Sequence, residues 1–179
     1  KQGEVVPYGE FNDNRIDLEN TDLTFIGNAI PKYYLSFNSV VTYKNFDFRA
    51  FFRGRFGYDI LNTLQLNYGN RVALPNNVLN DAFTRHADLN DTYMYSDYYL
   101  ENGSHLKLDE LTLGYTFKLN NERIRSFRIY ATGTNLALFT KYTGNDPDFI
   151  SDTGLAPSID NRGIFPNTRS FLFGLNIVF

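Results

Sequence analysis

The chain has 179 residues, of which 42% are hydrophobic and 17% aromatic, with no cysteine and a formal net charge of −3. It has no run of 18 or more apolar residues, which excludes a transmembrane helix but not membrane-spanning strands, because such strands turn only every second side chain to lipid. No basic patch is interleaved with stacking aromatic residues, so we do not expect nucleic acid as a partner.

Apolar side chains at alternating positions predict four strands before the C-terminal segment, at 33–43, 46–55, 105–117 and 126–140. Lys44-Asn45 predicts a tight turn between the first two. The third and fourth strands both move their apolar residues from one parity to the other. Such a switch predicts a β-bulge, near Asp109-Glu110 in the third strand and near Gly133 in the fourth, where Leu136 and Leu138 would take over the apolar face.

The last eleven residues predict a fifth strand, whose apolar face continues unbroken to a terminal aromatic residue. In an outer-membrane barrel this face meets lipid, and the terminal strand is what the barrel-insertion machinery recognises. The predicted assembly signal is Phe171, Phe173, Leu175, Ile177 and Phe179.

The connections alternate strictly between long and short. Residues 1–32, 57–104 and 141–168 are long, whereas Lys44-Asn45 and Lys118–Arg125 are short. This alternation is typical of an up-and-down barrel with long outer loops and short periplasmic turns. Within the second long connection, 60–68 is a candidate weak strand, and apolar residues at helical spacing over 78–83 predict a short amphipathic helix.

Five strands do not close a barrel, since the smallest barrels need about eight. Either further strands lie in the long connections, which would give a self-contained small outer-membrane barrel with a structural or enzymatic role, or most of the barrel lies outside this chain. A third alternative is a soluble secreted β-sandwich that binds carbohydrate through its 13 tyrosines.

Several sequence motifs, in order along the chain, resemble the C-terminal part of SusC/RagA-type TonB-dependent outer-membrane transporters. The chain departs from the family pattern at Asn45, where glycine is usual, and at Asp148, where glutamate is usual. The motifs are Asp22–Pro31, Tyr43–Phe48, Phe52–Ile60, Tyr98–Leu108, Leu111–Tyr115, Tyr130–Leu136, Thr143–Asp148 and Phe165–Phe171.

This resemblance implies that residues 1–179 are the C-terminal part of an all-β, antiparallel transmembrane barrel, about five strands of 22. The plug domain and the N-terminal barrel strands would then lie outside the chain. The implied function is TonB-dependent import of oligosaccharides or other large nutrients across the outer membrane of a Gram-negative, Bacteroidota-like bacterium. The implied partners are a SusD-like surface lipoprotein and the TonB–ExbB–ExbD complex.

Four arginines lie on polar strand faces and are expected to point into the barrel lumen, because charge facing lipid is costly. They are Arg49, Arg53, Arg55 and Arg128. Two interpretations stay open: contact with substrate or an electrostatic role in moving the plug, or a standing set of ion pairs to plug carboxylates. Aromatic residues at the turn ends of the strands predict a periplasmic girdle, made of Tyr43, Phe46, Phe117, Phe127 and Phe179.

The sequence contains no combination of residues typical of a catalytic site, and we do not expect the protein to be an enzyme. His86 and His105, the two histidines, lie in different segments without cysteine or metal-ligand spacing around them. No cofactor is expected. Four aspartates in the last long connection leave calcium binding in an outer loop open as a hypothesis: Asp146, Asp148, Asp152 and Asp160.

Overall fold

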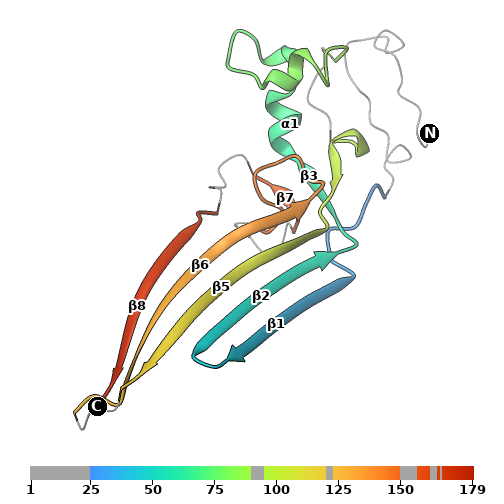
Figure 1. Ribbon diagram of the computed structural model, residues 1–179. Helices are drawn as coiled ribbons and strands as arrows, with labels where there is room; N and C mark the ends of the chain where they lie inside the picture. Colours follow the sequence, from blue (N-terminus) through green and yellow to red (C-terminus); the bar gives the residue numbers. More distant parts are fainter. Residues whose placement is uncertain (1–24, 90–94, 120–122, 150–156, 162–164, 166) are drawn as a thin grey trace, which may run out of the picture. The chain divides into compact units, whose positions relative to one another are not determined.

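The computed structural model describes residues 25–89, 95–119, 123–149, 157–161, 165 and 167–179 (Figure 1). These residues form two compact units. One unit is built mainly from residues 62–100, and the other from residues 28–61 and 101–179. None of the described helices has the length and the apolar character needed to cross a membrane.

The second unit contains a five-stranded antiparallel sheet, which confirms the five predicted strands and the all-β fold class. Its spatial order is β1-β2-β5-β6-β8, and neighbouring strands are hydrogen-bonded (Figure 1). The strands are β1 (Tyr33–Tyr43), β2 (Phe46–Phe56), β5 (His105–Lys118), β6 (Ser126–Thr140) and β8 (Ser170–Val178).

The remaining short strands form a separate three-stranded sheet in the order β4-β3-β7. They are β3 (Asp59–Asn62), β4 (Leu100–Asn102) and β7 (Ile159–Asp160). A small apolar core of Tyr58, Ile60 and Tyr142, with Phe149 against it, lies beside this sheet. Thus 57–104 and 141–168 do not contribute further long strands among the described residues.

The first unit is mostly helical and corrects two sequence predictions. The candidate strand at 60–68 is wrong beyond Asn62, because the Asn62 side chain accepts a hydrogen bond from the Gln65 amide and caps helix α1 (Thr63–Tyr68). The amphipathic helix expected over 78–83 is a single 3₁₀ turn, η2 (Asn80–Phe83). Two further 3₁₀ turns are η1 (Arg71–Ala73) and η3 (Asp97–Tyr99).

The tight turn between β1 and β2 is confirmed. Tyr43 pairs directly with Phe46, and Lys44 takes a left-handed backbone conformation with φ of 56°. A two-residue connection of this kind fixes the register of the whole hairpin. Each residue on the apolar face of β1 therefore pairs with a residue on the same face of β2, from Tyr43 and Phe46 at the turn to Tyr33 and Phe56 at the far end.

The bulge in β5 is confirmed at Asp109. Leu108 and Glu110 pair with successive positions of β2, Phe52 and Phe51, so Asp109 is the extra residue. One inserted residue reverses the parity of the strand, which is why Leu106 and Leu108 share a face with Leu111 and Leu113.

The parity switch expected in β6 is wrong. Thr134 pairs with Glu110 and Ala137 pairs with Leu108, so two residues of β6, Asn135 and Leu136, stand opposite Asp109. Inserting two residues preserves parity, and the apolar face continues with Ala137 and Phe139. Leu138 pairs with Lys107 on the polar face instead.

The apolar face of the large sheet is open to the surroundings in the described residues. Phe37 is 58% exposed and Phe173 is 80% exposed, and Ala50 is the one apolar residue of these five strands in the buried core of the described chain. A β-sandwich would bury such a face against a second sheet. The alternative of a soluble sandwich is therefore not supported, and neither is a self-contained barrel, since β1 and β8 form two separate edges.

The two faces of the sheet predict opposite effects of a charged substitution at neighbouring positions of β8. Phe173 lies on the apolar face opposite Ala131, and its neighbour Leu172 lies on the polar face opposite Thr132. In the full-length protein, Phe173→Arg should destabilise the membrane-inserted state by about 2–4 kcal/mol, whereas Leu172→Arg should be tolerated. The measurement is the amount of folded, heat-modifiable protein in the outer membrane. Equal loss in both variants would contradict this assignment of faces.

Candidate functional site

The polar face of the sheet carries an ion pair that crosses a strand. Arg128 on β6 donates from Nε to the Asp47 carboxylate on β2 over 2.8 Å, and a second guanidinium nitrogen also pairs with it. Gly114 of β5 lies between them, and a Cβ there would come within 2.5 Å of both groups. Glycine at this position therefore lets β2 and β6 be joined directly across β5.

The Arg128 guanidinium also lies over the Tyr130 ring, 4.6 Å from its centroid. That ring in turn covers Gly174 of β8, where an added Cβ would collide with it. The ion pair and the ring thus link four strands on one face of the sheet.

A larger set of charges lies at the far ends of β2 and β5. Arg53 donates to the Asp109 carboxylate over 2.6 Å and to the Asp148 carboxylate over 2.7 Å. Arg55 pairs with the other oxygen of Asp148 at 3.3 Å. Asp109 is the bulged residue of β5, so the bulge places its side chain within reach of Arg53.

Lys107 extends this set below the sheet surface. Its side chain is 3% exposed, and its ammonium donates to Asp146 over 2.8 Å and to Asp148 over 3.5 Å. Arg53, Arg55, Lys107, Asp109, Asp146 and Asp148 are called the charge cluster below. Because Asp146 and Asp148 follow β6, the cluster also binds the segment 142–149 to strands β2 and β5.

The Asp146 carboxylate accepts three hydrogen bonds. Besides Lys107, the Asn167 side chain donates to it over 2.6 Å, and the Asp148 amide donates over 2.9 Å. Burial acts to raise the pKa of Asp146, but these donors and the Lys107 charge outweigh burial and hold its pKa below the usual range.

Buried polar contacts outside the cluster hold the same segment. The Tyr58 hydroxyl donates to the Pro147 carbonyl over 3.1 Å and lies 3.2 Å from His105 Nδ1, and burial raises the pKa of Tyr58 to about 12. Tyr142 donates to the Asp160 carboxylate, and burial raises the pKa of both groups. His105 therefore contributes to the packing of this segment through its contact with Tyr58.

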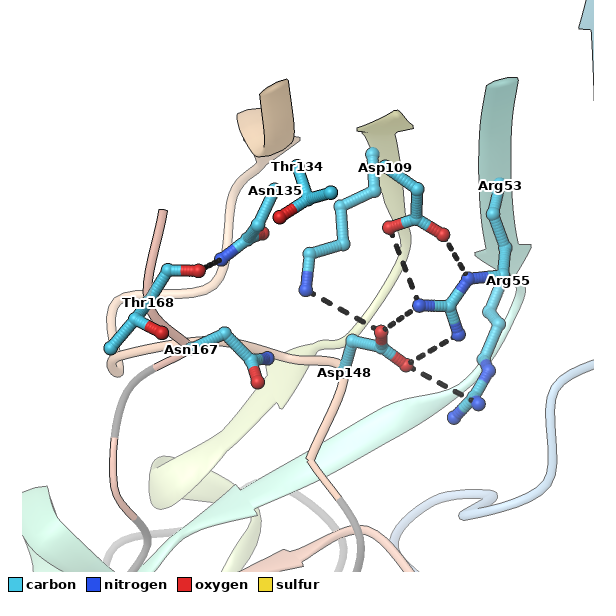
Figure 2. Close-up of a pocket in the computed structure, with 9 residues that line it drawn as sticks. Arg53, Arg55, Asp109, Thr134, Asn135, Asp148, Asn167 and Thr168 are labelled. Carbon is cyan, nitrogen blue, oxygen red and sulfur yellow. Dashed lines mark hydrogen bonds and ion pairs between the residues drawn. The ribbon is translucent and has the colours of Figure 1, made fainter. Parts of the chain in front are cut away.

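A polar pocket of about 440 Å³ opens between the charge cluster and β6 (Figure 2). On one side lie Arg53, Arg55, Asp109 and Asp148; on the other lie uncharged side chains. Asn135 takes a left-handed φ of 54° and donates to the Thr168 carbonyl over 3.2 Å. The uncharged residues are Thr134, Asn135, Asn167 and Thr168.

The four arginines predicted from sequence lie on one face. The structure pairs them with carboxylates of this chain, whereas one of the two interpretations from the sequence paired them with carboxylates of the plug. Arg49 has only a 3.8 Å approach to Glu110 and a bond to Asn38. Lys107, Asp109 and Asn135 were missed as site residues. The predicted bulge was a signal for Asp109, whereas no local signal marked Asn135. That these side chains face a lumen stays a prediction.

The turn ends of the strands carry four of the five predicted girdle residues in two adjacent pairs. Phe117 stacks on Phe127 at 4.4 Å, and Tyr43 pairs with Phe46. Tyr115, which was not predicted, joins the row between Phe46 and Phe117. The predicted assembly residues of β8 share the exposed apolar face, with Phe179 one residue beyond the strand end.

The calcium hypothesis has no support in the described residues. Asp146 and Asp148 accept bonds from cationic side chains, and Asp160 accepts one from Tyr142. Asp152 lies outside the described residues. Among the residues that the structure describes, no group of three or more His, Cys, Asp or Glu side chains is placed to hold a metal ion. His86 lies in the other unit, with Nδ1 2.7 Å from the Tyr98 hydroxyl.

Comparison with known proteins finds relatives over nearly the whole chain, although no protein-family model matches it. The TonB-dependent receptor P3 of Formosa agariphila is 29% identical over 99% of this chain and 20% of that receptor. The TonB-dependent receptor SusC of Bacteroides thetaiotaomicron is 31% identical over 81% of this chain and 15% of SusC. The chain spans about a fifth of the length of the curated relatives that it matches.

Solved structures of a transporter complex share the fold. The RagAB peptide importer in the closed-closed state superposes with a TM-score of 0.68 at 19% identity, over 90% of this chain and 19% of that chain. Its open-open state gives 0.59 over 84% of this chain and 17% of that chain. At this identity the likeness concerns the fold alone.

The charge cluster predicts that one carboxylate dominates the docking of segment 142–149. Asp148 is 7% exposed and is shared by three cations, one of which, Arg53, is 38% exposed. Asp148→Asn should lower the free energy of local opening by about 3 kcal/mol, the lower end for a broken buried pair. Native-state hydrogen exchange of the full-length protein in detergent measures this. Glu110→Gln, which removes the 3.8 Å approach to Arg49, should change it by less than about 1 kcal/mol.

The lowered pKa of Asp146 predicts that the stability of segment 142–149 depends on pH. A carboxyl group with a lowered pKa stabilises the folded state above its ordinary pKa, and this stability disappears as the pH falls through the folded value. The Asp148 amide, bonded to Asp146, should stay protected from exchange from pH 7 to about 5 and lose protection below about 3.9. Asn167→Ala should move the loss to higher pH. An unchanged midpoint would show that Asn167 does not hold Asp146 ionised.

Proposed function

Because this chain belongs to the SusC/RagA-type TonB-dependent receptors, we propose that it supplies the C-terminal part of their barrel wall. The plug domain and the other barrel strands would lie in the remainder of the receptor. The two exposed edges of the sheet support this proposal, since an open edge leaves backbone groups without partners in lipid. In the complete barrel β1 and β8 pair with other strands.

The observation that carries the proposal is the contrast between the two faces of one sheet. One face is apolar and exposed over all five strands, while the other holds the charge cluster and the Asp47–Arg128 pair. Lipid suits the first face and a polar lumen suits the second. Arg49, Arg53, Arg55 and Arg128 then face the lumen, and the row from Tyr43 to Phe127 forms the periplasmic girdle.

The proposed activity of the whole receptor is TonB-dependent import of oligosaccharides or other large nutrients across the outer membrane of a Bacteroidota-like bacterium. Peptides belong among these nutrients, since RagAB is described as a peptide importer. A SusD-like surface lipoprotein would cover the barrel, and the TonB–ExbB–ExbD complex would supply the energy through the N-terminal part. This segment contributes wall, outer loops and assembly signal, with no catalytic role.

In this arrangement the long connections lie outside the cell and the short turns lie in the periplasm. The β1–β2 turn and the C-terminal end of β8 are at the same end of the sheet (Figure 1), which suits one membrane side for both. Phe171, Phe173, Leu175, Ile177 and Phe179 would then serve as the signal read by the barrel-insertion machinery.

The test removes the complete receptor from the bacterium that carries it. Growth should be lost on a neutral oligosaccharide or on a protein digest and restored by the intact gene. A protonophore should stop uptake while leaving surface binding of the labelled nutrient unchanged, because TonB coupling needs the proton gradient. Normal growth of the deletion strain on every nutrient, or uptake that persists without the gradient, would contradict the proposed function.

A further inference from the structure

We propose that the polar pocket between β2, β5 and β6 is a subsite for a neutral polyhydroxylated ligand, such as one sugar unit of an oligosaccharide. The inference rests on the proposed function and narrows its substrate class. Three features of the pocket carry it: the balance of its charges, the chemistry of its uncharged wall, and the backbone that shapes both.

The charges of the charge cluster, which borders the pocket, cancel one another. Arg53, Arg55 and Lys107 stand against three carboxylates, and the pairs close at 2.6, 2.7 and 2.8 Å. The carboxylates are Asp109 and Asp148, which line the pocket, and Asp146, which does not line it but pairs with Lys107. An anionic ligand would have to displace Asp109 or Asp148 from Arg53, and a cationic ligand would have to displace Arg53 from them. Separating such pairs in a half-buried site is costly, so the pocket disfavours both kinds of ligand.

The opposite wall offers amides and hydroxyls. Thr134, Asn135, Asn167 and Thr168 line it, and Figure 2 shows their side chains across the pocket from Arg53. Amide and hydroxyl groups both donate and accept hydrogen bonds. A sugar hydroxyl does the same, and carboxylate oxygens on the facing wall accept further bonds from it. A ligand rich in hydroxyl groups can therefore bind both walls without disturbing an ion pair.

The backbone is built to present these groups. The bulge residues of two neighbouring strands, Asp109 on β5 and Asn135 on β6, stand opposite each other and both line the pocket. Bulges re-aim side chains, and a left-handed φ of 54° is costly for any residue other than glycine, least so for asparagine. The volume of about 440 Å³ lies within the range of small-ligand sites.

The experiment uses the purified full-length receptor in detergent and calorimetric titration. The probes are neutral hexasaccharides (maltohexaose, cellohexaose, laminarihexaose, xylohexaose and mannohexaose), with hexagalacturonate and a tryptic casein digest as charged comparators. At least one neutral hexasaccharide should bind, and neither comparator should bind more tightly. Asn135→Gly, which keeps the left-handed backbone but removes the amide, should weaken binding about tenfold.

Two further variants separate the site from the fold. Thr134→Val keeps the shape of the side chain and removes its hydroxyl, and it should weaken binding about threefold to tenfold. Asn176→Gly makes the same substitution as at position 135, on the same face of the sheet opposite Arg128, and it should leave binding unchanged. All three variants should retain the heat-modifiable folded form.

The outcomes distinguish this inference from the proposed function. If neither pocket variant weakened binding of the neutral hexasaccharide, the ligand would bind elsewhere and the inference would be overturned. Tighter binding of hexagalacturonate or of the peptides would also overturn it. So would the failure of every neutral hexasaccharide to bind. None of these results touches the proposed import function, which is decided separately by the growth and protonophore tests. Loss of binding in Asn135→Gly and Thr134→Val, with Asn176→Gly unchanged, would support the subsite.

Discussion

The antiparallel ladder gives the sheet one continuous apolar face, although single apolar residues such as Leu138 and Leu172 lie on the polar face, and the remaining features depend on that separation. Alternation along β1, β2 and β8 is uninterrupted, but β5 and β6 both carry insertions. The single extra residue Asp109 and the double insertion Asn135-Leu136 stand opposite each other. Because the ladder continues correctly on both sides of this irregularity, Leu106 and Phe139 stay on the apolar face and Lys107 stays on the polar face.

The polar face is organised by charge pairs that join strands and connections distant in sequence. Arg128 reaches Asp47 across β5, and this is possible because Gly114 leaves the space. At the far end of the sheet, Asp148 meets Arg53, Arg55 and Lys107 and thereby ties the connection after β6 to β2 and β5. In a wall that separates lipid from a polar interior, such pairs keep buried cations neutralised without help from the apolar face.

The insertions that interrupt the regular pairing of β5 and β6 also shape the pocket. The two bulges redirect Asp109 and Asn135 toward the segment 142–149 and the residues before β8, and the pocket that we propose as a sugar subsite lies where the regular pleat is broken. The strain at Asn135 is small enough for the surrounding hydrogen bonds to hold it, including the bond to the Thr168 carbonyl. The regular strands therefore provide the wall, and the exceptions to their regularity provide the recognition surface.

The sequence by itself determined the five long strands, the tight turn at Lys44-Asn45, the bulge at Asp109 and the family, because these follow from local periodicity, turn chemistry and short motifs. It failed at 63–68, where the cap at Asn62 outweighed an alternating pattern, and at β6, where one and two inserted residues cannot be told apart from composition. Only the tertiary structure decided which carboxylates neutralise Arg53, Arg55 and Lys107. Their partners lie up to 95 residues away, and no local pattern encodes a contact that depends on the register of three strands.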